Sequence, residues 1–153
     1  MIDTLKALFQ DSPAESDDTL KQRLHLAAAA LLVETMKADF STSELERQTL
    51  QKLLEQSLSL KKEQVHLLIE QAQTRTEEAT SLYEFTRLIN QHFSPEYKRL
   101  LIQAMWRVAY ADGNLDKYEE ALIRQVAELI YVAHTDYIQA KLIAAGDMNN
   151  QAL

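Results

Sequence analysis

Residues 108–130 read VAYADGNLDKYEEALIRQVAELI, and this stretch predicts two helices joined by a short acidic turn. After the turn, Ile123, Ala127 and Tyr131 follow one another at four-residue steps, which is the helical period. Gly113 offers the left-handed backbone that commonly ends a helix. The stretch therefore predicts an antiparallel helical hairpin.

A weaker copy of this pattern lies 73 positions earlier, at LVETMKADFSTSELERQTLQKLL, residues 32–54. The offset places Asp39 on Asp112 and Glu46 on Glu119, and the apolar positions follow it. Phe40 stands where the second copy has Gly113, so the first turn bends differently. We expect two pseudo-repeats, at about residues 18–72 and 93–145.

The periodicity predicts an all-α, single-domain bundle of about eight helices in two related halves, spanning residues 1–153. The chain has two glycines and two prolines, too few turn residues for a sheet protein. Ser94 and Pro95 predict a helix start, and Gly146 predicts a helix end followed by a frayed tail at 147–153. The expected helices cover about 2–9, 18–38, 44–58, a segment after Ser59, 81–93, 95–111, 117–131 and 136–145.

Charge, hydropathy and composition argue against several classes of function. The net charge is −7 and basic residues do not cluster, which argues against a nucleic-acid binder. The longest apolar run, residues 26–33, is too short to cross a bilayer, and no cysteine offers a thiol nucleophile or a disulfide. We expect a soluble cytoplasmic protein whose acidity suits a cation, a basic partner or solubility.

The acidic turn has two interpretations. Asp112, Gly113, Asp116 and Glu119 match the second half of a calcium-binding loop, although Val108 and Tyr110 stand at its first and third ligand positions. Alternatively, Asp116 and Glu119 form a capping box, as do Ser43 and Glu46 in the first copy, and Gly113 only ends the earlier helix. Both interpretations stay open at this point.

These stretches, with RLHLAAAALLVE at 23–34, LYEFTRLINQHFS at 82–94 and MWRVAYADG at 105–113, resemble the TerB (tellurite-resistance) family in its small stand-alone bacterial form. The resemblance covers nearly the whole chain. It implies an all-helical fold in two halves, an association with chemical stress and envelope-linked systems, and a divalent-metal role for the acidic turns. The matching acids are Asp112, Asp116 and Glu119, with Asp39 and Glu46 as the weaker set.

No other motif indicates catalysis. His25 lies between two leucines, which is typical of a core boundary. Four aromatic residues around the second turn predict core packing, with a partner groove as the alternative: Trp106, Tyr110, Tyr118 and Tyr131. We therefore expect a non-enzymatic stress-associated module with an unidentified protein partner, binding Ca²⁺, Mg²⁺, Mn²⁺ or Zn²⁺ at residues 112–119. The alternative is a metal-independent scaffold or adaptor whose acids only cap helices.

Overall fold

The computed structural model describes residues 17–38 and 44–152, with side chains over 19–38 and 44–146, and every element in this part of the chain is a helix. The predicted all-α class is confirmed. Seven helices are described, whereas about eight were expected; the short helix expected at 2–9 lies outside the described residues. The helices are α2 (Asp17–Lys37), α3 (Glu44–Leu58), α4 (Lys62–Glu78), α5 (Tyr83–His92), α6 (Pro95–Ala109), α7 (Lys117–Leu129) and α8 (His134–Ala152).

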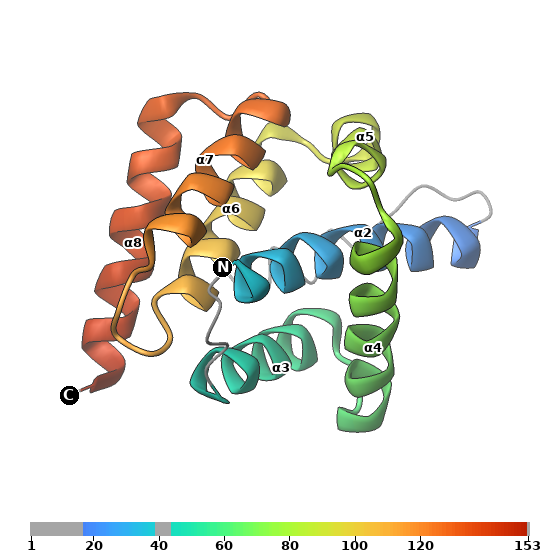
Figure 1. Ribbon diagram of the computed structural model, residues 1–153, viewed down its shortest axis with the longest axis horizontal. Coiled ribbons are helices and arrows are strands. Elements are labelled where there is room, and N and C mark those ends of the chain that lie inside the picture. Colours follow the sequence, from blue (N-terminus) through green and yellow to red (C-terminus); the bar gives the residue numbers. More distant parts are fainter. Residues whose placement is uncertain (1–16, 39–43, 153) are drawn as a thin grey trace.

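Helix α2 occupies the centre of the molecule and the other helices surround it (Figure 1). It contacts α3, α4, α5, α6 and α7, so the first half of the chain packs directly against the second. Its run of alanines, residues 27–30, is fully buried, because small side chains let neighbouring helices approach closely. The core therefore continues across both halves.

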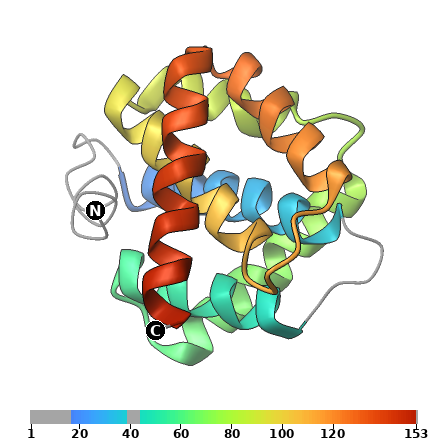
Figure 2. The ribbon, with the colours of Figure 1, turned by 90° about the vertical axis from the view of Figure 1, so that its left-hand side faces the viewer.

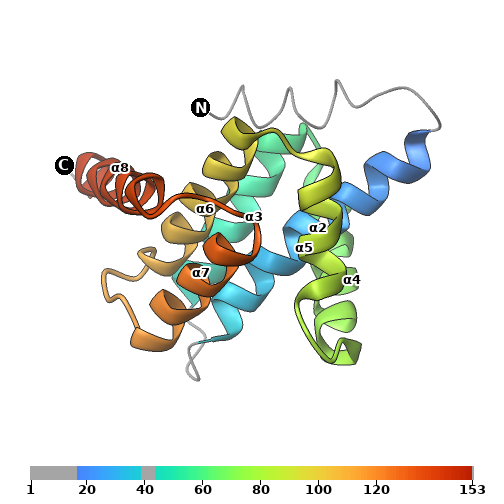
Figure 3. The same ribbon diagram turned by 90° about the horizontal axis from the view of Figure 1, so that it is seen from above.

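The second half forms a layer of three helices on one side of α2. Helix α6 packs on α2 with one face and on α8 with another, and α8 is the outermost helix (Figures 2 and 3). Residues 101–106 and 108–109 of α6 are buried, which is typical of a helix covered on several faces. Trp106, the one tryptophan of the chain, is fully buried in this layer.

Two helix starts follow the prediction. The Ser94 hydroxyl accepts a hydrogen bond from the Tyr97 backbone N–H at 3.2 Å, and Pro95 occupies the first turn of α6. At α7, Asp116 is the N-cap. These side chains satisfy amides that have no partner inside the helix, so each helix starts at a defined residue.

The prediction that Gly146 ends the last helix is wrong, because α8 continues to Ala152. Among the two glycines only Gly113 has a positive φ, so Gly146 has no left-handed turn to supply and a helix can pass through it. The end of α7 instead uses a tyrosine. Tyr131 has φ +63°, and the Val132 N–H donates to the Ala127 carbonyl at 2.8 Å, as in a Schellman motif.

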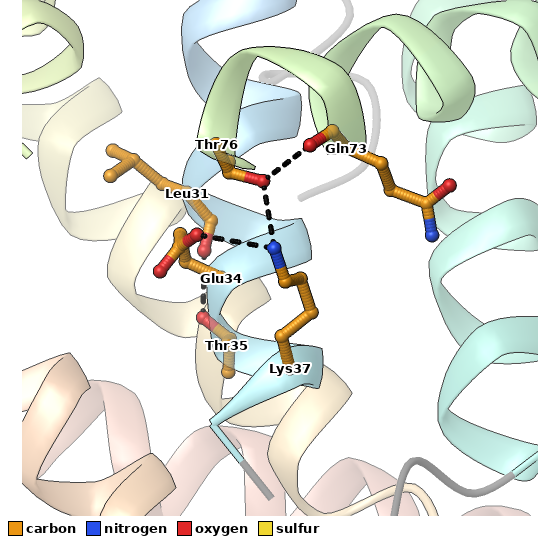
Figure 4. Close-up of polar contacts among 6 residues, drawn as sticks. All are labelled: Leu31, Glu34, Thr35, Lys37, Gln73 and Thr76. Carbon is orange, nitrogen blue, oxygen red and sulfur yellow. Dashed lines mark hydrogen bonds and ion pairs between the residues drawn. The ribbon is translucent and has the colours of Figure 1, made fainter. Parts of the chain in front are cut away.

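A polar contact joins the carboxyl-terminal ends of α2 and α4 (Figure 4). Lys37 Nζ donates to Thr76 Oγ1 at 3.1 Å and lies 3.8 Å from Glu34 Oε1. The Thr76 hydroxyl in turn donates to the Gln73 carbonyl at 2.9 Å, so this buried oxygen both accepts and donates. The contact fixes the end of α2 just before the first acidic turn, whose residues 39–43 lie outside the described part.

None of the described helices is long and apolar enough to span a membrane.

Candidate functional site

The second acidic turn connects α6 to α7, and its backbone is set by Tyr110 and Gly113. Helix α6 ends at Ala109, two residues earlier than expected, and Tyr110 is its C-cap. Gly113 has φ +84° and its N–H donates to the Tyr110 carbonyl at 2.9 Å. Since φ is positive there, a residue with a Cβ would be strained even though nothing lies within 4 Å of that position.

The three acids of this turn all bind backbone amides. Asp112 Oδ1 accepts from the Asn114 N–H at 3.0 Å. Asp116 Oδ2 accepts from the Tyr118 N–H at 2.9 Å and the Glu119 N–H at 3.3 Å, and Glu119 Oε1 accepts from the Asp116 N–H at 3.3 Å. The predicted capping box of Asp116 and Glu119 is therefore confirmed.

Glu119 is 0% exposed, and so is Glu46, which the 73-residue offset places opposite it. Each glutamate lies in the first turn of its helix, α7 and α3 respectively, where the positive end of the helix dipole favours a carboxylate. Burying a carboxylate costs free energy unless hydrogen bonds compensate for the lost water. The structure must therefore supply polar partners at both positions. Asp39, Phe40 and Ser43 of the first turn lie outside the described residues, as does the predicted Ser43–Glu46 capping box.

The geometry of the second turn can be compared with what a divalent cation requires. Hard cations take six or more oxygens, several of them from converging carboxylates. Over the described residues, no group of three histidine or acidic side chains is placed to hold a metal ion. Asp112, Asp116 and Glu119 are close in sequence, but each is oriented by a backbone amide, and the buried Glu119 is turned into its own helix start. The carboxylates as placed do not form a ligand set, and the metal assignment stays a prediction.

An aromatic cluster packs beside the turn. The Trp106 ring lies 6.0 Å from that of Tyr110 and 5.3 Å from that of Tyr137. Lys141 Nζ lies 5.2 Å from the centre of the Trp106 ring and donates to Glu120 Oε2 at 3.0 Å. The hydrogen bond to Glu120 raises the pKa of Lys141, and burial raises the pKa of Tyr137. The lysine of this α7–α8 ion pair thus lies over the indole ring.

The predicted core packing is confirmed for Trp106 and Tyr110 and wrong for Tyr118 and Tyr131. Tyr118 is 50% exposed and Tyr131 is 81% exposed. Lys141 and Glu120 were missed in the sequence because they are 21 positions apart and only the packing of α8 on α6 and α7 brings them together. The helical periodicity of apolar residues predicts which residues face the core. It does not predict which charged residues of different helices meet at the edge of the core.

His25 lies on α2 at the edge of the core, as predicted, and its side chain is only partly exposed. Burial, with a smaller contribution from the positive charge of Lys21, lowers the pKa of His25 from 6.5 to about 4. The imidazole is therefore neutral at neutral pH. The neutral His25 side chain packs at the edge of the core, and its surroundings disfavour protonation of the ring.

The comparisons with known proteins agree with the fold. Residues 25–142 match the family model described as tellurite resistance protein TerB, which is more than two thirds of the chain. The chain matches no curated protein and no solved structure. The matched region begins in α2 and ends in α8, so it contains the acidic turn, both buried glutamates and the aromatic cluster. The chain belongs to the TerB tellurite resistance protein family.

Proposed function

We propose that this protein is a non-enzymatic, stress-associated helical binding module that works as a metal-independent scaffold or adaptor. The observation that carries the proposal is the geometry of the second acidic turn. Asp112, Asp116 and Glu119 each accept a hydrogen bond from a backbone amide, and together they fix the α6–α7 hairpin. Acids used in this way stabilise the hairpin through hydrogen bonds to its own backbone, as a metal-independent scaffold requires.

A non-enzymatic role is supported by what the acids of this turn do. General acid–base catalysis needs a titratable group whose proton can reach a substrate. The Glu119 carboxylate is fully buried at the start of α7, and the Asp116 carboxylate accepts from two amides, so both side chains serve as helix caps in this structure. The chain also has no cysteine to act as a nucleophile.

A cation-sensitive module is the competing function, and it uses the same residues. In it, Ca²⁺, Mg²⁺, Mn²⁺ or Zn²⁺ would bind Asp112, Asp116 and Glu119, and the family membership motivates it. Asp112 and Asp116 are partly exposed, and each uses one carboxylate oxygen for the amide contacts described above. The Glu119 side chain is fully buried and one of its carboxylate oxygens belongs to the capping box, which makes this function the second candidate.

A thermal melt distinguishes the two functions. The chelator-treated protein is titrated with each of the four cations and followed by circular dichroism, beside the variants Asp112→Asn/Glu119→Gln and, as a control on the exposed face of α7, Glu128→Gln. Under the adaptor proposal no cation raises the melting temperature saturably, and the double variant is destabilised equally with and without cations. A saturable rise that the double variant loses and the control keeps would establish the cation-sensitive module instead, because a ligand of the native state stabilises it by mass action.

A further inference from the structure

A surface hollow of about 530 Å³ lies between the first turns of α2 and the second half of α4. In Figure 1, α2 extends beyond α4 at the right of the molecule, and the two helices form a corner there. The hollow is lined by residues of one α2 face within 19–26 and one α4 face within 67–75. It is separate from the acidic turn, which lies between α6 and α7.

A second hollow, of about 110 Å³, continues the first toward α5. Arg23, Leu26 and Arg75 line both, so the two form one groove along the outer side of α2, named here the α2–α4–α5 groove. The Arg75 guanidinium is held in place by Glu84 of α5 at 2.7 Å. This ion pair fixes the junction between the two hollows.

The centre of the α2–α4–α5 groove is apolar and its edge is polar. Leu67 is 55% exposed, whereas the next two residues of α4, Leu68 and Ile69, are buried in the core. Leu26 lines the same hollow as Leu67 and is partly buried. The other described residues that line the larger hollow are polar or charged. An apolar centre inside a polar rim is the arrangement of protein-binding sites, where the rim keeps water from the central contacts.

The charges of the groove differ from those of the rest of the protein. The chain carries a net charge of −7, yet among the described residues three arginines and two glutamates line this groove. One arginine, Arg75, is paired with Glu84. Arg23 and Arg87 are exposed, and neither makes a hydrogen bond or an ion pair with a described residue. Two guanidinium groups that have no partner among the described residues lie beside the apolar centre, and they favour an occupant that carries carboxylates.

The shape of the groove favours a helix as occupant. Its two main walls are faces of α2 and α4, each about two turns long, or roughly 11 Å at 1.5 Å per residue. A helix that lies in such a groove uses apolar residues at three- and four-residue steps as anchors. We propose that the α2–α4–α5 groove binds an acidic amphipathic helical segment of a partner protein, with its apolar residues on Leu26 and Leu67 and its carboxylates beside Arg23 and Arg87. This inference rests on the proposed function as a binding module and names the chemistry of the partner.

The test is a selection of random peptides of about 15 residues, displayed on phage, against the full-length protein. The selection is counter-selected on the variant Arg23→Glu/Arg87→Glu, whose substitutions are at exposed positions. We expect enriched peptides with acidic residues and apolar residues at helical spacing. In fluorescence polarisation, the double variant should weaken the binding of such a peptide at least about tenfold, and added salt should weaken it further. The variant Lys52→Glu/Arg99→Glu makes the same change of charge at exposed sites outside the groove and should leave the affinity within about twofold.

Three results would overturn the proposal. The first is that no peptide is enriched over the counter-selection, and the second is that the enriched peptides lack acidic residues or bind Arg23→Glu/Arg87→Glu equally well. The third is tighter peptide binding by Ile2→Ser/Leu5→Ser/Leu8→Ser, which would mean that the chain's own amino-terminal segment fills the groove. Any of these results concerns the groove alone, because the cation titration tests the role of the acidic turn independently.

Discussion

Asp116 and Glu119 cap one another across the first turn of α7: each carboxylate accepts a hydrogen bond from the backbone N–H of the other residue, both at 3.3 Å. The Asp116 carboxylate also accepts from the Tyr118 N–H at 2.9 Å. Three amides that the helix itself leaves unpaired are thus satisfied by two side chains. The start of α7, and with it the bend after α6, depends on this pair.

Replacing Asp116 with alanine removes two of these hydrogen bonds, and we expect the free energy of unfolding to fall by about 1 to 2 kcal/mol. Asp116→Asn keeps an acceptor oxygen and should restore most of the loss. Urea denaturation followed by the fluorescence of the single, buried Trp106 gives the measurement. An alanine variant as stable as the wild type would contradict the capping role.

The two glycines should respond to alanine in opposite directions. Gly113 has φ +84°, so Gly113→Ala introduces backbone strain and should lower stability by about 1 kcal/mol. Gly146 lies inside α8 with open space where a Cβ would lie, so Gly146→Ala should raise stability by about 0.5 to 1 kcal/mol. Each variant is the control for the other, and equal signs in urea denaturation would refute the assignment of the two backbones.

Tyr131 offers a third backbone test, at the end of α7. Its side chain is 81% exposed, so it contributes little burial, while its positive φ disfavours a residue with a Cβ. Tyr131→Gly should therefore raise stability by about 0.5 to 1 kcal/mol even after the loss of the exposed contact with Lys98, whose Nζ lies 5.9 Å from the ring centre. Tyr131→Ala, which keeps the Cβ and loses the ring, should leave stability unchanged or slightly lower. A glycine variant no more stable than the alanine variant would count against strain at this position.

The low pKa of His25 should make the protein less stable as the pH falls. Its pKa is about 4 in the folded protein and near 6.5 when unfolded, so the unfolded chain binds a proton first as the pH falls. This contribution to stability is full above pH 6.5 and is lost between pH 6.5 and 4, by up to about 3 kcal/mol. Stability of His25→Gln should fall less steeply in that window, as measured by urea denaturation at a series of pH values. Parallel curves for variant and wild type would rule out His25 as the source.

The sequence predicted local structure well at two helix starts, where a side chain pairs with nearby backbone. The starts at Ser94 and Asp116 are encoded within four residues, so their capping chemistry could be read from residue type and spacing alone. The end of α8 could not, since a glycine allows a left-handed turn without requiring one, and Gly146 continues the helix. The end of α7 could not be predicted for the opposite reason, because the bulky Tyr131 occupies the left-handed position where glycine is expected.

The candidate sites were predictable to different degrees. The contacts of the acidic turn lie within eight residues, 112–119, and their capping role was one of the two interpretations that the spacing allowed. The α2–α4–α5 groove was not foreseen, because Arg23, Arg75 and Arg87 form no cluster in the sequence. Only the crossing of α2 with α4 and α5 brings them to one surface. A search for runs of basic residues misses a charged surface of this kind.

The central position of α2 also affects how the chain can fold during its synthesis on the ribosome. Helix α2 precedes the other described helices, so it leaves the exit tunnel before the helices that bury it, which extend along the chain to α7. Its alanine-rich core can pack against α3, α4 and α5 early, but it remains without α6 and α7 until these two helices have also been made. A nascent chain stalled before α6 would present to chaperones the part of α2 that α6 and α7 cover, and α2 would be buried completely only after these two helices had left the exit tunnel.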